Sequence, residues 1–122
     1  MSGGHFDYWQ YHIDRIAEDI KDVIIKNKVE VPNAEHERWD YDSDGNLYDY
    51  AKYYYCFDDE TIEKFKEAYK KLKEAYVYAQ RVDWLLSGDD GEESFHKRLK
   101  EDLEEVENHF KNEKWLYKPE ED

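Results

Sequence analysis

The sequence is poor in the residues that build disulfide-rich, thiolate-metal and loop-rich proteins. It has one cysteine, Cys56, in 122 residues, with five glycines and two prolines. A single cysteine excludes an intramolecular disulfide and a zinc site built on several thiolates. Cys56 stands within an aromatic run at 53–57, so we expect its thiol to be buried and unreactive.

Long apolar runs are also missing. No stretch approaches the roughly 20 apolar residues that cross a bilayer. The opening residues, Met1 to His5, have neither the basic nor the apolar region of a signal peptide. We therefore predict a cytoplasmic protein without a membrane partner, which would work in the host cell cytoplasm if a phage encodes it.

Basic residues are in the minority, with 18 Lys and Arg against 32 Asp and Glu and a net charge of −14. Such a surface repels nucleic acid and favours a basic protein or a metal cation. The chain nevertheless carries 12 Tyr, 5 Phe and 4 Trp, which argues against disorder. We expect one acidic domain over residues 1–122.

The motifs of common enzymes are absent as well. The chain has no Gly-x-Ser-x-Gly elbow and no phosphate-binding glycine loop. Its five histidines include no pair at the spacing of a hydrolytic zinc helix. The sequence therefore predicts a non-catalytic protein without a tightly bound cofactor.

Apolar residues recur at helical spacing in three segments, which predicts a mainly α fold. The three amphipathic helices are expected at about 7–27, 58–87 and 90–112. The expected N-terminal caps are Asp7 with Gln10, Asp58, and Asp89 with Glu92 or Asp90 with Glu93. Ser87-Gly88 is a typical end for the second helix.

The segment at 36–56 has a different pattern. Aromatic residues flank the turn sequence Ser43-Asp44-Gly45-Asn46, which predicts a small β-hairpin or an ordered aromatic loop. Near the end of the chain, residues 115–117 are expected to fold back onto the core. The tail from about 118 is expected to fray.

The carboxylates of Asp40, Asp42 and Asp44, followed by Gly45, match the first half of a calcium loop. The twelfth position is Ala51, where such loops place a bidentate Glu. An Asp-rich turn without metal explains the same pattern and is the favoured interpretation. A weak calcium site at these three residues stays open as an alternative.

Two acidic stretches point to a basic partner. Residues 30–60 hold ten acids against two basic residues, a local net charge of −8, and residues 89–107 hold nine against three, a net of −6. The leading hypothesis is that an acidic face engages a basic, nucleic-acid-binding host protein. The face would imitate the row of phosphates in the nucleic acid that this host protein binds. The residues expected to carry the contact are Glu35, Glu37, Asp40, Asp42, Asp44 and Asp49.

The second expected helix combines cations with aromatic rings, which can hold a nucleotide by charge and stacking. The residues predicted for such a site are Lys66, Tyr69, Lys73, Tyr76, Arg81 and Trp84. This alternative describes a homo-oligomer that sequesters a nucleotide-like signal. The same lysines alternate with Glu63, Glu67 and Glu74, so surface ion pairs explain them equally well.

Two segments carry a resemblance. Met1-Ser-Gly-Gly-His-Phe-Asp-Tyr8 and the stretch from Tyr78 to Leu99 resemble a family of small uncharacterised proteins of bacteria and phages. Together they cover about a quarter of the chain. The resemblance supplies no catalytic or binding residues. It implies a setting, that of a phage or mobile-element accessory protein that counters host defence.

Overall fold

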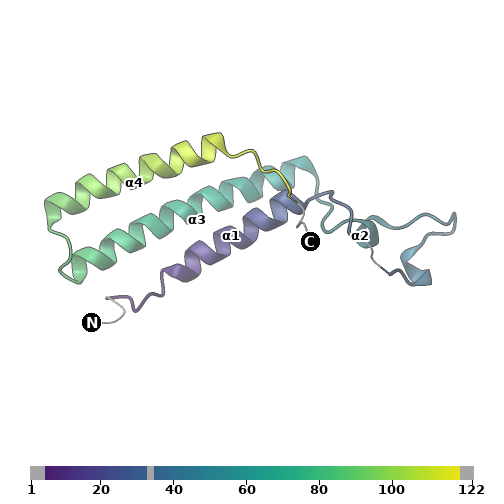
Figure 1. Ribbon diagram of the computed structural model, residues 1–122, viewed down its shortest axis with the longest axis horizontal. Helices are drawn as coiled ribbons and strands as arrows, with labels where there is room; N and C mark the ends of the chain where they lie inside the picture. The colour runs from purple at the N-terminus through teal and green to yellow at the C-terminus, as the bar shows by residue number, and fades with distance from the viewer. Residues whose placement is uncertain (1–4, 33–34, 119–122) are drawn as a thin grey trace.

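Helix α3 (Asp59–Leu86) is the central element of the structure, a computed structural model that describes residues 5–32 and 35–118. Helix α1 (Tyr11–Lys26) packs along one side of α3 and α4 (Glu92–Asn112) along another (Figure 1). Within the described ranges, α1 and α4 form no comparable interface with each other. The predicted mainly α fold with three amphipathic helices is confirmed.

Helix α3 begins and ends where its sequence predicts. The Oδ1 atom of Asp58 accepts a hydrogen bond from the Thr61 backbone N–H at 2.8 Å, which caps the first turn. At the other end Ser87 follows the last helical residue, and Gly88 takes a φ of +85° that glycine adopts without strain. Local chemistry is sufficient to set both ends.

Helix α1 begins later than predicted, at Tyr11 instead of near Asp7. Residues 5–10 form an irregular turn in which Asp7 and Tyr8 have φ values of 52° and 65°. The predicted cap of Asp7 with Gln10 is therefore wrong. The reason is a tertiary contact, because the Phe6 N–H donates to the buried Asp83 Oδ1 of α3 at 2.8 Å.

The predicted cap of α4 is also wrong. Gly91 occupies the N-cap position and no side chain caps the helix. The side chain of Asp90 is instead only 2% exposed and lies 3.0 Å from Arg98 Nη1. This carboxylate is committed to buried ion pairing and is not available to the first turn of α4.

The segment after α4 returns to the bundle as expected. The ring of Trp115 meets that of Tyr69 edge-on at 5.3 Å between centroids and that of Phe110 at 5.9 Å. Tyr117 reaches Tyr54 at 6.3 Å, while Leu116 stays exposed. The tail predicted to fray lies mainly outside the described residues.

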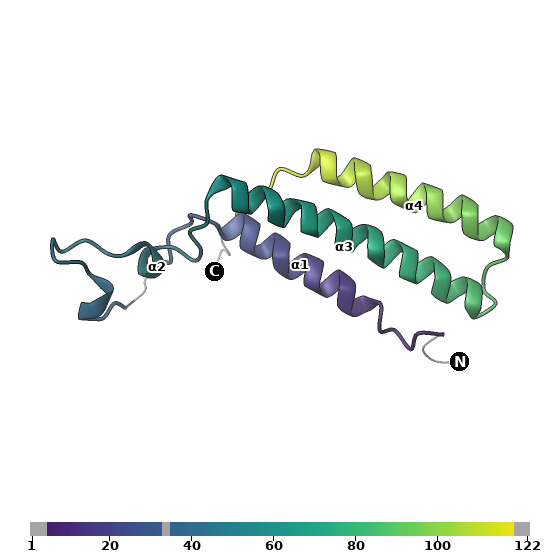
Figure 2. The same cartoon turned by 180° about the vertical axis from the view of Figure 1, so that it is seen from behind.

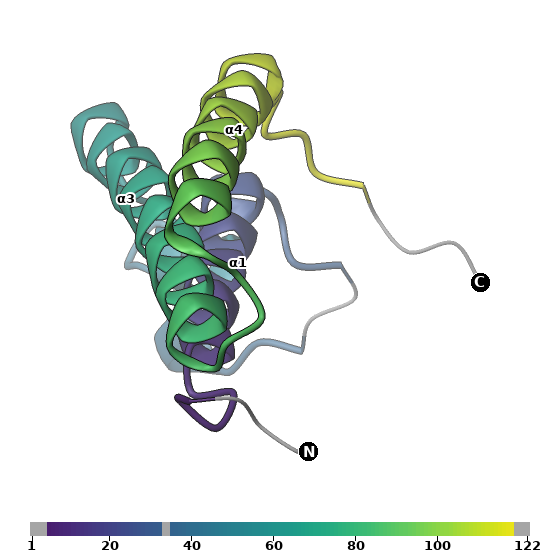
Figure 3. The same cartoon turned by 90° about the vertical axis from the view of Figure 1, so that its left-hand side faces the viewer.

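Residues 28–32 and 35–57, called the arm from here on, project from one end of the helices (Figures 1 and 2). Backbone hydrogen bonds close the base of the arm: Lys28 N–H to Tyr55 O at 2.7 Å and Val31 N–H to Lys52 O at 3.0 Å. Seen from the α3–α4 turn, the arm lies behind the helices (Figure 3). It is thus at the opposite end of the molecule from that turn.

The arm is an ordered loop and not a β-hairpin. A 3-10 turn, η1 (Arg38–Asp40), and a short helix, α2 (Asp49–Lys52), interrupt it, and its described residues form only isolated bridges such as Tyr41 with Leu47. At its tip Asp42 Oδ1 accepts from the N–H groups of both Asp44 and Asn46 at 2.9 Å. Helical turns on both sides of this tight turn prevent two continuous strands from pairing.

Candidate functional site

A groove of about 510 Å³ runs between α1 and α4, with α3 as its floor. It is lined by Asp14, Glu18 and Lys21 of α1, by Tyr69, Lys73 and Tyr76 of α3, and by Asp102, Glu105 and Phe110 of α4, among others. Charged side chains of the groove form ion pairs between these helices, such as Lys73 of α3 with Asp14 and Glu18 of α1.

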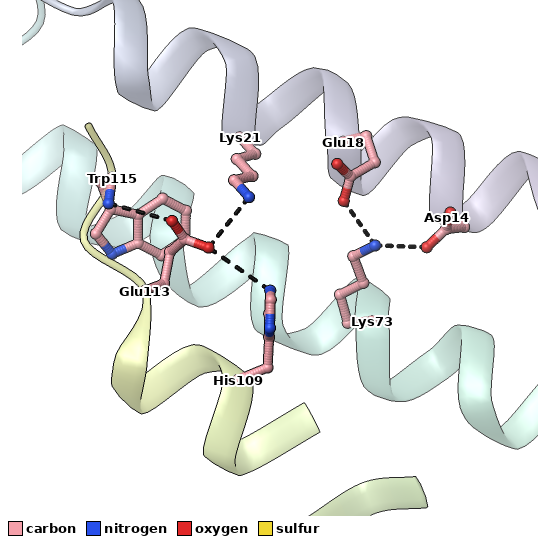
Figure 4. A network of polar contacts seen from close by, with 7 residues as sticks. All are labelled: Asp14, Glu18, Lys21, Lys73, His109, Glu113 and Trp115. Carbon is pink, nitrogen blue, oxygen red and sulfur yellow. Dashed lines mark hydrogen bonds and ion pairs between the residues drawn. The ribbon is translucent and has the colours of Figure 1, made fainter. Parts of the chain in front are cut away.

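The ammonium of Lys73 is held between two carboxylates of α1 (Figure 4). It lies 2.6 Å from Asp14 Oδ1 and 2.6 Å from Glu18 Oε2, and 5.5 Å from the centre of the Tyr69 ring. Burial lowers the pKa of Lys73, but hydrogen bonds to Asp14 and Glu18 outweigh it and raise the pKa overall. The ammonium of Lys73 is thus protonated, and the two carboxylates of α1 balance its positive charge.

A second network joins α1, α4 and the segment after α4 through Glu113 (Figure 4). Its carboxylate lies 3.1 Å from Lys21 Nζ and 3.6 Å from His109 Nε2, and it accepts the Trp115 N–H at 3.3 Å. These contacts hold the end of α4 against α1. Their role is structural, since every charged partner belongs to this chain.

The structure does not bring the six predicted nucleotide-binding residues together. Tyr69, Lys73 and Tyr76 line the groove, whereas Lys66, Arg81 and Trp84 do not. Tyr69 is only 2% exposed, so its ring has no face for a base to stack on.

The cations of this set already have partners in the chain. Lys66 pairs with Glu63 at 3.3 Å, and Arg81 Nε lies 2.6 Å from Asp102 Oδ2. Lys66 and Arg81 lie outside the groove, and the predicted cation that lines it, Lys73, is paired with Asp14 and Glu18.

Two of the three carboxylates predicted for calcium, those of Asp40 and Asp42, accept backbone N–H groups nearby in the chain. Asp40 Oδ2 accepts the Glu37 N–H at 2.9 Å and lies 3.8 Å from His36 Nδ1. Asp42 closes the tip turn, which is the Asp-rich turn that the sequence favoured. In the described part of the chain no three His, Cys, Asp or Glu residues are grouped to hold a metal ion.

The six acids predicted to contact a partner lie on the arm. They differ from the acids of the groove in ion pairing. Glu35, Glu37, Asp44 and Asp49 are exposed, and Asp40 and Asp42 are partly exposed. Among the described residues, no lysine or arginine lies within ion-pair distance of any of the six carboxylates. In the described part of the chain their charge is therefore not paired with a lysine or an arginine.

The two acidic stretches do not form one continuous face. The arm projects beyond one end of the helices, whereas the stretch at 89–107 starts at the α3–α4 turn, at the opposite end (Figure 1). A ladder of charges that combines both stretches is therefore not what the structure presents.

Sequence reasoning missed the exposure of the aromatic side chains on the arm. Trp39 is 68% exposed and Tyr50 65%. The remaining exposed aromatic residues of the arm are Tyr41, Tyr48, Tyr55 and Phe57. A signal was present in the sequence, because Leu47 and Ala51 are the only aliphatic residues from 35 to 57. Aromatic residues without aliphatic partners cannot build a core of their own.

Two of these rings form a platform. Tyr48 and Tyr50 stack with centroids 5.6 Å apart and planes inclined by 14°. The Tyr50 hydroxyl donates to the Trp39 carbonyl oxygen at 2.9 Å, which ties the platform to η1. The stack is a solvent-exposed aromatic surface on an element whose six predicted partner-binding carboxylates have no lysine or arginine partner in the described chain.

The expectation that Cys56 is buried is wrong. Its thiol is exposed and lies 3.7 Å from Asp49 Oδ2. The aromatic run around it lies along the arm and is only half covered, so no core surrounds the thiol.

Comparison with known proteins identifies no relative. No family model, curated protein or solved structure matches the chain. The resemblance to small phage proteins therefore stays a prediction, and function has to be inferred from the residues themselves. None of the helices in the described ranges has the length and apolar character that a membrane crossing needs.

Proposed function

We propose that the protein is a non-catalytic binding protein whose arm engages a basic protein. The observation that carries the proposal is the pairing pattern: groove acids such as Asp14 and Asp102 neutralise cations of the chain, whereas the six arm acids do not. An uncompensated charge on a projecting element attracts a partner of opposite charge and speeds its association.

The exposed aromatic residues supply the second part of an interface. Trp39, Tyr48 and Tyr50 lie on the same arm as the unpaired carboxylates. Trp39 and Tyr50 are more than half exposed, and Tyr48 is 46% exposed. Tyr and Trp are enriched among the residues that dominate binding energy, because they bury a large area with few rotatable bonds. Charge would bring the partner to the arm and the aromatic rings would hold it there.

The phage-like setting adds a class of target to this proposal. A counter-defence factor with this surface would bind a nucleic-acid-binding host protein and occupy its basic site. The arm alone would make the contact, since the acidic stretch on α4 starts at the other end of the molecule.

The test compares two double charge reversals of equal charge change. The arm variant carries Glu35→Lys and Asp44→Lys, and the control carries Glu101→Lys and Glu104→Lys on the exposed side of α4. Each immobilised protein is offered bacterial lysate at 50 and 300 mM salt, and the retained proteins are identified by mass spectrometry.

We expect the wild type and the α4 control to retain the same basic proteins at low salt and to release them at high salt. The arm variant should not retain them. Identical sets of retained proteins for all three chains would contradict the proposal.

Nucleotide sequestration and weak calcium binding remain as alternatives. Native mass spectrometry of gently purified protein distinguishes them, because each adds a characteristic mass. A homo-oligomer with an extra mass of nucleotide size would favour nucleotide sequestration over the present proposal. A higher melting temperature in millimolar calcium would favour the calcium alternative.

A further inference from the structure

The chain contains one site that already binds an arginine. The Arg81 guanidinium carbon lies 4.5 Å from the centre of the Trp84 ring, and its Nε lies 2.6 Å from Asp102 Oδ2. A flat cation is thus held by an aromatic face together with a carboxylate. The lysine ammoniums of the chain lie farther from their rings, as with Lys26 at 5.3 Å from Tyr54 and Lys66 at 5.6 Å from Trp115.

At the base of the arm Lys52 lies 5.4 Å from the centre of the Tyr53 ring and 3.6 Å from Glu30 Oε1, whereas the tip presents rings and carboxylates for which the described chain supplies no lysine or arginine. Tyr48 is 46% exposed and Tyr50 65%, so the stack has ring surface open to solvent. Asp49, the residue between them, is exposed, and no lysine or arginine of the described chain pairs with it. Asp49 stands between the two tyrosines in the sequence, and its Oδ2 lies 3.7 Å from Cys56 Sγ. A cation that stacks on the rings near this carboxylate would have to come from a partner.

Guanidinium and ammonium differ in how they use such a surface. The guanidinium group is planar and weakly hydrated, so it stacks on a ring and still donates two hydrogen bonds to a carboxylate. An ammonium is a compact, strongly hydrated charge that gains little from stacking. The hydrogen bond from the Tyr50 hydroxyl to the Trp39 carbonyl restrains one ring of the platform, which lowers the entropy lost when a guanidinium docks.

We propose that the arm selects arginine over lysine side chains on its partner, with the Tyr48–Tyr50 stack as the platform. This inference rests on the proposed function, since it names which basic side chain the arm recognises. It goes beyond that function because charge alone would not distinguish the two cations.

The experiment measures binding of fluorescein-labelled octa-arginine and octa-lysine to the full chain by fluorescence anisotropy at 50 mM salt. The two peptides carry the same charge, so charge attraction is matched. We expect octa-arginine to bind about tenfold more tightly, the equivalent of one or two stacked guanidinium groups.

Three variants locate the selectivity. Tyr48→Ala with Tyr50→Ala should lower octa-arginine affinity to that of octa-lysine and leave octa-lysine affinity unchanged. Tyr48→Phe with Tyr50→Phe keeps the rings and should retain most of the selectivity. Tyr78→Ala, at an exposed tyrosine of α3 outside the arm, is the matched control and should bind as the wild type does. Circular dichroism checks that the helices are intact.

Each result has a distinct meaning. Equal affinity for the two peptides would overturn the inference and leave the proposed function standing. Selectivity that survives in the double Ala variant would also overturn it, because the platform would not be its source. Failure of both peptides to bind at low salt would contradict the proposed function itself.

Discussion

The carboxylate of Glu113 lies 3.1 Å from the ammonium of Lys21 and so joins the segment after α4 to α1. This contact matters because the extensive helix interfaces of the described residues are those of α1 and α4 with α3. Trp115, two residues on, covers Tyr69 and Phe110 in a backbone conformation with φ of 52°. Glu113 therefore holds in place a segment whose backbone is locally unfavourable.

Replacing Glu113 with Gln should destabilise the fold by about 1 kcal/mol, since the pair with Lys21 is partly buried and also orders Trp115. Urea denaturation followed by circular dichroism measures the change. Glu67→Gln is the matched control, because the Lys64–Glu67 pair is exposed, with side chains 72% and 61% accessible. It should change stability by no more than about 0.3 kcal/mol. Equal effects of the two changes would refute a special role for Glu113.

Stability should fall as the pH drops below about 4.5, the ordinary pKa of a Glu side chain. Burial raises the pKa of Glu113, but hydrogen bonds from Lys21 and the Trp115 N–H outweigh it, so its pKa in the folded protein is lowered. The unfolded chain then binds more protons between the two pKa values, and this contribution to stability is lost on acidification. Melting temperatures from pH 7 to 3 should fall less steeply for Glu113→Gln than for the wild type. Parallel curves would show that another group is responsible.

Asp90→Asn should cost about 2 kcal/mol, because it removes a buried negative charge that compensates the largely buried Arg81 and the more exposed Arg98. The Asp90 carboxylate lies 3.0 Å from Arg98 Nη1, and its second oxygen faces Arg81 Nη1 at 3.5 Å without a well-aligned hydrogen bond. The neighbouring Asp89 is exposed, so Asp89→Asn is the control and should be nearly neutral. Thermal and urea unfolding of both variants measure the difference. A similar cost for Asp89→Asn would assign the effect to the turn and not to the ion pairs.

The helices should fold without the tip of the arm. The buried residues of the described chain all lie outside the arm, at Gln10, Ala17, Ile24, Ile62, Tyr69, Asp83 and Asp90. The hydrogen bond from the Val31 N–H to Lys52 O already brings the two sides of the arm together at its base.

A Gly-Ser tetrapeptide in place of residues 35–50 should therefore change the free energy of unfolding by no more than about 1 kcal/mol. Urea unfolding measures the stability, and the anisotropy experiment measures peptide binding, which should be lost. A chain that fails to fold would show that the arm contributes to the core.

Only part of the candidate site could be predicted from the sequence. Acid content led to the prediction that residues such as Glu35 and Asp44 form a partner surface, and no lysine or arginine of the described chain pairs with them. The stack of Tyr48 on Tyr50 could not be foreseen, because it depends on α2 beginning at Asp49 and turning the chain between the two rings. The set around Tyr69 and Arg81 was chosen by spacing along one helix. Spacing does not show that α1 and α4 supply carboxylates to those cations.

The sequence by itself determined the helical class, the length of α3 and both of its ends, since periodic apolar residues, the Asp58 cap and Gly88 act within one turn of the chain. Only the tertiary structure decided where α1 begins and what Asp90 does, because Asp83 and Arg81 reach across from α3 and outcompete the local caps. The same holds for the arm. Whether an aromatic side chain is covered or exposed depends on what packs against it, and no other element of the described chain covers Trp39 or Tyr50.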